Sequence, residues 1–133
     1  MELKSLLTDT KKITADFPGA KGFKVTLAYL SKEKLRKISE KSKTYDFDPD
    51  TRKPVQAIDD ELFSKLYIEQ AILGWEGLKY EYLTKLVLVD GELPEGELEF
   101  SLENASTLVN NSPTFDRWVS SVASDISLFN KGS

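Results

Sequence analysis

Three aspartates at alternate positions, Asp46, Asp48 and Asp50, come closest in type and spacing to a chemical site. Carboxylates at this spacing open the calcium loop of an EF-hand, in which oxygen ligands surround the ion. Such a loop also needs glycine at its sixth position and a bidentate glutamate at its twelfth. Those positions hold Thr51 and Ala57. We therefore interpret the segment as an acidic connector and expect no metal there.

The absence of two residue types restricts the remaining chemistry. The chain has no cysteine and no histidine, which excludes thiolate and imidazole metal sites as well as Ser–His and Cys–His nucleophile pairs. Carboxylates, lysine, tyrosine and serine would have to do any chemistry alone. The pair Asp59-Asp60 is better explained as a helix start than as an acid and its base. We predict no catalytic residue, no cofactor and no enzymatic activity.

Composition favours a single domain without a membrane anchor. The chain has 133 residues, of which 40% are hydrophobic and 30% charged, as in an ordinary globular fold. No window approaches the roughly 18 apolar residues of a membrane-spanning helix. The first residues lack the apolar stretch and cleavage site of a signal peptide. Without cysteines there is no disulfide framework, so we expect a cytoplasmic protein.

Charge is distributed unevenly along the chain. Residues 1–43 hold 11 Lys and Arg against 5 Asp and Glu, a net +6, and residues 44–133 hold 7 against 17, a net −10, which sum to −4. Such segregation is compatible with self-association or with steering of a partner. Mutual neutralisation within one fold is an equally simple alternative. The basic segment 31–43 carries no aromatic residue among its cations, so we expect a solvated helix rather than nucleic-acid binding.

The pattern of apolar residues predicts an α+β fold. Residues 1–16 are interpreted as a flexible N-terminal arm, 17–131 as a single domain, and 132–133 as a remnant of cloning. A small antiparallel sheet of about three strands is expected to pack with about four helices. The strands are expected at 23–29, 83–89 and 97–100, the last two forming a β-hairpin, and the helices near 31–43, 60–75, 101–110 and 113–129.

The stretch AILGWEGL marks the end of the most apolar predicted helix. This helix is hydrophobic over most of its circumference, which indicates a central position or burial against a partner. Trp75 is expected in its last turn, where a large ring closes the edge of the core, and Gly77 as its left-handed terminator. We therefore favour a structural role for Trp75 over a ligand site. The helix 113–129 shows the clearest amphipathic spacing in the chain.

The order of these segments resembles a known family. A strand-to-helix opening, FKVTLAYLSKEKLRKI, is followed by the acidic loop YDFDPDTRKPVQAID. Then come a hydrophobic helix ending in GWEGL and two capped helices, FSLENASTLV and SPTFDRWV. Over residues 23–129 this is similar to the tail assembly chaperones of long-tailed bacteriophages. One departure is segment 79–99, KYEYLTKLVLVDGELPEGELE, where such proteins commonly have a short loop.

The resemblance implies a non-enzymatic protein of the host cell cytoplasm. Such chaperones bind the long tape measure protein, keep it soluble, help the tail tube protein polymerise around it and leave before the particle is finished. Many are also made as a longer, frameshifted product. Apolar grooves would receive amphipathic helices of the tape measure. The residues expected to contact a partner are Leu62, Leu66, Trp75, Leu78, Phe115, Trp118 and Val119.

Two other functions remain open at the level of sequence. The first is a small structural tail or connector protein, in which the predicted hairpin adds to the sheet of another subunit. The second is an acidic inhibitor that mimics nucleic acid, suggested by the charge of residues 44–133. That inhibitor would need carboxylates along one face at phosphate-like spacing, and the basic first third of the chain argues against it.

Overall fold

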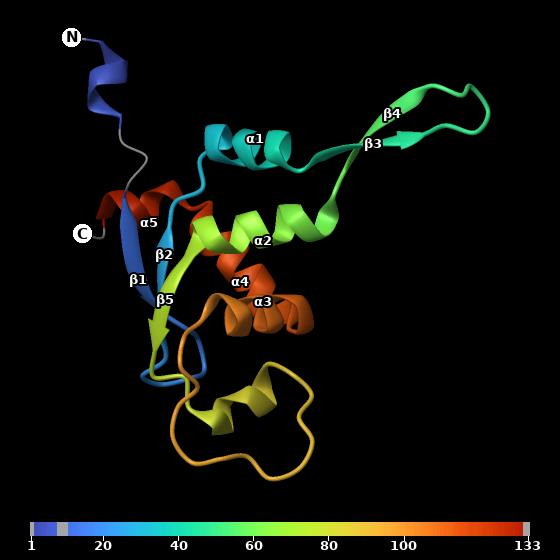
Figure 1. Ribbon diagram of the computed structural model, residues 1–133. Coiled ribbons are helices and arrows are strands. Elements are labelled where there is room, and N and C mark those ends of the chain that lie inside the picture. Colours follow the sequence, from blue (N-terminus) through green and yellow to red (C-terminus); the bar gives the residue numbers. More distant parts are fainter. Residues whose placement is uncertain (1, 8–10, 132–133) are drawn as a thin grey trace.

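Strand β2 (Lys24–Ala28) is the middle strand of the sheet around which the chain folds. In this computed structural model, which describes residues 2–7 and 11–131, β2 pairs antiparallel with β1 (Lys12–Asp16) and with β5 (Ile72–Glu76) (Figure 1). Val25 and Leu27 point into the core and are completely buried. On the opposite face the hydroxyls of Thr14 and Thr26 lie 3.1 Å apart. The sheet therefore buries one face and leaves the other to solvent.

Helices pack against the buried face of this sheet, and the fold is α+β as predicted. Helices α2 and α4 contact β2. Helix α1 packs against α2, and α3 packs against both α2 and α4. The helices run as follows: η1 Leu3–Leu6, α1 Lys32–Lys41, α2 Asp60–Ala71, η2 Tyr80–Lys85, α3 Leu102–Asn111, α4 Pro113–Ala123 and α5 Ile126–Lys131.

The predicted starts of the longer helices are confirmed. Ser31, Asp59, Ser101 and Ser112 each accept a hydrogen bond from the backbone N–H three residues further on. Each bond satisfies one of the N–H groups that a helix start leaves unpaired, so these short polar side chains fix where α1, α2, α3 and α4 begin. Ser112 is itself buried, which makes its cap part of the core.

The prediction of a flexible arm over residues 1–16 is wrong for its second half. Residues 12–16 form the edge strand β1, in register with β2 from Lys12 opposite Ala28 to Asp16 opposite Lys24. Ile13 and Ala15 lie partly buried against the core. Only Ile13 and Ala15 alternate here with polar residues, so the period-two signal is weak. Residue 1, residues 8–10 and the expected remnant 132–133 lie outside the described residues.

The predicted hairpin at 79–99 is also wrong. Residues 80–85 form the 3-10 helix η2, the rest of 83–89 is irregular, and 97–100 contributes only an isolated bridge from Glu97 to Lys79. Leu86 is buried and Leu83 partly buried, three residues apart, whereas Leu88 is fully exposed. A short apolar run does not distinguish a strand from a helical turn. Here the chain forms a helical turn, which buries one side of the run.

The hairpin of this protein lies instead in the acidic connector. Strands β3 (Lys43–Phe47) and β4 (Pro54–Ile58) pair only with each other and form a ribbon that projects from the body (Figure 1). At its root, buried Ser42 donates its hydroxyl to the carbonyl of Ile38 (2.6 Å) and accepts at its own carbonyl the N–H of Asp59 (2.8 Å). The ribbon is therefore attached to α1 on one side and to α2 on the other.

Two predicted helices end earlier than expected. The helix 60–75 stops at Ala71, and the chain continues directly as β5, where Trp75 pairs with Val25. Gly77 does have a positive φ of 74°, but it follows this strand rather than a helix. The helix 113–129 divides into α4 and α5, because Asp125 accepts the N–H of Ser127 and starts a new helix.

We predict that Gly77→Ala will destabilise the fold far more than Gly91→Ala. Both glycines have similar positive φ values, 74° and 79°, so each substitution carries the left-handed penalty of about 1–2 kcal/mol. At Gly91 an added Cβ meets nothing within 4 Å, whereas at Gly77 it collides with the backbone of Gly22. Overpacking of this kind adds about 1–3 kcal/mol. Urea denaturation of both variants measures the difference, and equal losses would contradict the close approach of the two glycine backbones.

Candidate functional site

Three of the residues expected to bind a partner lie inside the core. Leu78 and Phe115 are 0% exposed and Val119 is 1% exposed. Phe115 and Val119 lie on the side of α4 that faces the sheet, and Leu78 follows β5 into the same cluster. The apolar spacing correctly indicated that these side chains are buried, but they are buried within the chain's own core. These three side chains offer no surface to a partner in this structure.

The two tryptophans close opposite sides of the aromatic core. The indole N–H of Trp75 donates to the carbonyl of Leu98 (2.9 Å), and its ring meets Phe100 edge-on at 5.0 Å between centroids. Trp118 meets Phe17 edge-on, also at 5.0 Å. Both tryptophans are partly buried. Their contacts give both a structural role, as the sequence indicated for Trp75.

The segments GWEGL and FSLEN, which carry the family resemblance, meet where the ring of Trp75 lies edge-on to Phe100. GWEGL also bonds to the two residues at positions 97 and 98 that come shortly before FSLEN: Trp75 donates to the carbonyl of Leu98, and the N–H of Gly77 donates to the carboxylate of Glu97 (2.9 Å). The side-chain amide of Asn104 donates to the carbonyl of Glu99 (3.0 Å). Segment 79–99 therefore leaves β5 and returns to it. The sequence of the two segments does not predict this contact, because no single-sequence pattern links residues 20 or more positions apart.

The remaining expected residues, Leu62 and Leu66, stand four positions apart on α2 and so share one face of the helix. Leu62 is 36% exposed. Leu66 is partly buried and faces α1, where it lines a small hollow of about 80 Å³ with Lys34, Lys37 and Lys41.

An open groove lies between α2 and its neighbours α3 and α4, and neither Leu62 nor Leu66 lines it. One part, of about 500 Å³, lies between α2 and α3 and is lined by Lys65, Glu69, Leu102 and Thr107 among others. A second part, of about 380 Å³, lies where α2 and α3 meet α4 and includes Phe63, Tyr67 and Val109. Asn110 lines both parts, so they adjoin. The groove combines aromatic and aliphatic walls with polar side chains.

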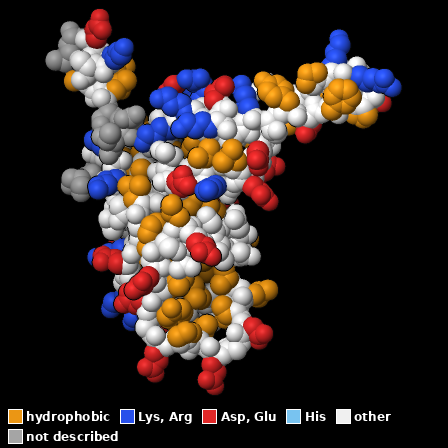
Figure 2. Space-filling view, viewed as in Figure 1, with side chains coloured by type: hydrophobic (Ala, Val, Ile, Leu, Met, Phe, Trp, Pro, Cys, Tyr) orange, Lys and Arg blue, Asp and Glu red, His pale blue; other side chains and the backbone are white. Residues whose placement is uncertain are grey.

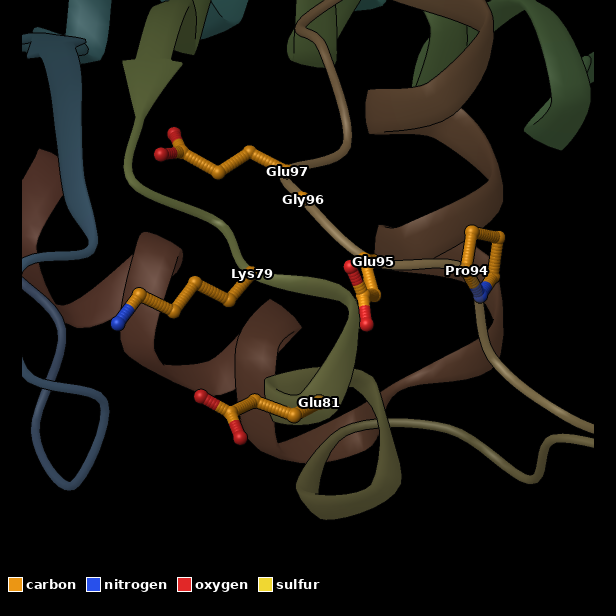
Figure 3. A pocket seen from close by; sticks show the side chains of 6 residues that line it. All are labelled: Lys79, Glu81, Pro94, Glu95, Gly96 and Glu97. Atoms are coloured by element: carbon orange, nitrogen blue, oxygen red, sulfur yellow. The ribbon is translucent and has the colours of Figure 1, made fainter.

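A smaller pocket beneath η2 is acidic. It has a volume of about 330 Å³ and is lined by Lys79, Glu81, Pro94, Glu95, Gly96 and Glu97. Figure 3 shows these side chains spread around the opening instead of converging on one point. Among residues 2–7 and 11–131, no group of three acidic side chains is placed to hold a metal ion. We find no arrangement of groups for catalysis in this pocket.

The β3–β4 ribbon carries the most exposed aromatic side chains of the described chain. Tyr45 is 69% exposed and Phe47 66%, and Val55 and Ile58 are also exposed. Figure 2 shows hydrophobic side chains along the ribbon, with basic ones at its tip. An isolated two-stranded hairpin is only marginally stable in water. Sequence reasoning missed this surface, although the alternation of Tyr45 and Phe47 was a usable signal.

Two hydrogen-bonded carboxylates, one in the turn of the ribbon and one on α1, have shifted pKa values. The carboxylate of Asp48 accepts the N–H of Asp50 (2.9 Å), and this bond lowers the pKa of Asp48 below its ordinary value. On α1, the hydrogen-bonded ion pair of Arg36 with Glu33 lowers the pKa of Glu33 and raises that of Arg36. The basic residues of α1 are mostly exposed, as expected of a solvated helix.

A third apolar surface lies near the chain start. Leu3, Leu6 and Leu7 are 65–70% exposed and share a hollow of about 280 Å³ with Tyr29 and residues of α5. None of these leucines was singled out as a contact residue from the sequence.

Comparison with known proteins gives no relative for this chain. No family model matches it, and neither a curated protein nor a solved structure does so. No helix within the described ranges is long and apolar enough to cross a membrane.

We expect Trp75→Phe to destabilise the protein by more than the loss of ring area alone. The substitution keeps an aromatic ring but leaves the carbonyl of Leu98 without its indole donor, which costs about 1–3 kcal/mol for a group shielded from water. Trp118→Phe is the matched control, because its ring packs against Phe17 and Phe115. Thermal denaturation compares the two variants. A smaller loss at position 75 than at 118 would contradict the role assigned to this bond.

The turn of the ribbon should weaken at acid pH. Because the folded pKa of Asp48 is lowered, its bond to Asp50 is fully present above the ordinary aspartate pKa and is lost as pH falls through the folded value. The protection of the Asp50 amide against hydrogen exchange, taken relative to the rate of an unstructured amide at the same pH and followed by NMR between about pH 5 and pH 2, measures this loss. In Asp48→Asn the amide oxygen accepts without titrating, so the protection at Asp50 should no longer change with pH. A pH dependence that persists in this variant would contradict the assignment.

Proposed function

We propose that this chain is a non-enzymatic tail assembly chaperone of a long-tailed bacteriophage. In this role it binds the tape measure protein in the host cytoplasm, keeps it soluble and promotes polymerisation of the tail tube protein. The observation that carries the binding role is the open groove along α2 and α3. The family resemblance supplies the identity of the partner.

The groove has the properties that a reversible helix-binding site requires. An amphipathic helix places apolar side chains at intervals of three and four residues into a hydrophobic groove, and here Phe63, Tyr67 and Leu102 provide apolar walls. Polar side chains such as Glu69 and Asn110 alternate with them, which limits the apolar area that a bound helix can bury. A chaperone that leaves before the particle is complete needs such a modest interface.

The contact between the GWEGL and FSLEN segments supports the resemblance on which the partner depends. Two separate sequence matches could arise by coincidence, but Trp75 of GWEGL and Phe100 of FSLEN are in edge-on ring contact, with centroids 5.0 Å apart. The second segment also begins α3, one wall of the groove. The contact of Trp75 with Phe100 thus supports the position of this wall beside β5.

We predict that Leu102→Glu will abolish capture of the tape measure without unfolding the chaperone. Leu102 is 47% exposed and lines the groove from the first turn of α3, so a charge there is tolerated by the monomer but opposes docking of an apolar helix face. Leu128→Glu is the control, since Leu128 is also exposed, at 36%, but lies on α5. Co-expression with the tape measure protein encoded in the same genome, followed by measurement of its soluble fraction and co-purification, compares both with the unmodified chain.

A second variant fills the groove instead of charging it. Thr107 is exposed on α3 and lines the groove, so Thr107→Trp should also prevent capture. If the unmodified chain neither solubilises nor binds the tape measure, the chaperone proposal fails. If capture occurs but is lost equally in the Leu102→Glu and Leu128→Glu variants, the chaperone role stands and the groove is not the site.

The projecting ribbon favours one alternative, a small structural tail or connector protein. A two-stranded ribbon with exposed edges could extend the sheet of another subunit in the particle. Mass spectrometry of purified particles separates the two proposals. A chaperone should be absent from finished particles, whereas a connector should be present in stoichiometric amounts.

A further inference from the structure

The hydrogen-bond register of the β3–β4 ribbon leaves the outer edge of β3 unpaired. At one end Asp59 donates to Ser42, and at the other Asp48 donates to Lys53. Both pairs belong to the same register as Tyr45 opposite Gln56. Since bonded and non-bonded pairs alternate in an antiparallel ladder, Thr44 and Asp46 bond inward to β4. The N–H and C=O groups of the residues between them therefore point outward: Lys43, Tyr45 and Phe47.

The two edges of the ribbon differ in their capacity to pair. On β4 the outward-facing positions are residues 54, 56 and 58. Pro54 has no N–H to donate, and proline on an edge strand hinders further pairing. The edge of β3 has no proline and carries the exposed aromatic rings of Tyr45 and Phe47. The β3 edge is thus the one built to accept another strand.

Charge along this edge changes sign from its beginning to its end. Lys41 and Lys43 precede Tyr45, and Asp46, Asp48 and Asp50 follow it. If two copies of β3 lie antiparallel, the basic beginning of each runs beside the acidic end of the other. A parallel arrangement would place like charges together. The edge is therefore complementary to a second copy of itself.

We propose that two copies of this chain associate through their β3 edges to form a continuous four-stranded antiparallel sheet. The register centred on Tyr45 gives the greatest overlap, with Tyr45 opposite its own copy and Lys43 opposite Phe47. On the other face Thr44 lies opposite Asp46, so no two like charges meet directly. A two-fold axis through Tyr45 makes this contact closed and self-complementary. A four-stranded sheet also removes the marginal stability of an isolated hairpin.

The second copy fits this edge better than the partner proposed for the groove. A helix satisfies its own backbone groups and cannot pair with an exposed strand, so a helical tape measure would leave the outward N–H groups of β3 unpaired. The groove lies between α2, α3 and α4, away from the ribbon. This inference therefore goes beyond the proposed function and does not depend on it.

Disulfide cross-linking tests the register directly, because the chain contains no cysteine. In the proposed dimer the two copies of residue 45 form a hydrogen-bonded pair with Cα atoms about 5.5 Å apart, within the range of roughly 4.4–6.8 Å that a disulfide spans. Tyr45→Cys should give a disulfide-linked dimer under mild oxidation. Gln56→Cys, directly across the ribbon on β4, is the matched control. We expect the variant at 45 to cross-link at least about tenfold faster, since pairing raises its effective concentration.

A second pair of variants examines the edges without introducing a covalent bond. Tyr45→Pro removes an outward N–H from β3, and Gln56→Pro removes one from β4. Circular dichroism verifies that both retain the fold, and sedimentation equilibrium measures their mass. The unmodified chain and Gln56→Pro should dimerise, whereas Tyr45→Pro should remain monomeric. Equal cross-linking at 45 and 56, or a monomeric unmodified chain at every concentration, would overturn the proposal. The latter result would assign the edge to an extended segment of another protein.

Discussion

The packing of Phe23 against Phe115 is the contact on which the rest of the structure depends. Both rings are completely buried and stacked, with centroids 6.3 Å apart. Phe23 precedes β2 and Phe115 begins α4, so the contact joins the middle of the sheet to the helix that covers it. Phe17 and Trp118 extend the cluster on one side, and Trp75 and Phe100 extend it on the other. Large rings in contact contribute both buried area and preferred edge-on geometry.

This cluster explains why the groove has a defined shape. Trp75 holds Leu98 and Phe100 against β5, and the chain enters α3 immediately afterwards. Helix α4 is fixed at Phe115 and begins at the buried cap of Ser112, which is also the residue that ends α3. The positions of α3 and α4 beside α2 thus follow from contacts in the core. The binding surface proposed here rests on rigid elements, as a pre-organised site should.

The elements with strong local signals could be predicted from the sequence, and those that depend on distant contacts could not. Side-chain caps at Ser31, Asp59, Ser101 and Ser112 located the helix starts because a cap is a local interaction. The end of α2 could not be located, because residues 72–76 pair with β2 some 50 positions earlier in the chain. The site shows the same division. Leu62 is exposed, and its contact with a partner stays a prediction. The apolar period that selected Phe115 and Val119 is the same whether the covering partner is another protein or the chain's own sheet.

Ser42 at the root of the ribbon has a mechanical consequence. The ribbon continues from α1 without a linker, and its return strand leads through Asp59 into the first turn of α2. Because Ser42 is bonded both to the last turn of α1 and to Asp59, the two strands leave the body from one shared anchor. Movement of the ribbon at its base is therefore coupled to the end of α1 and to the start of α2 together.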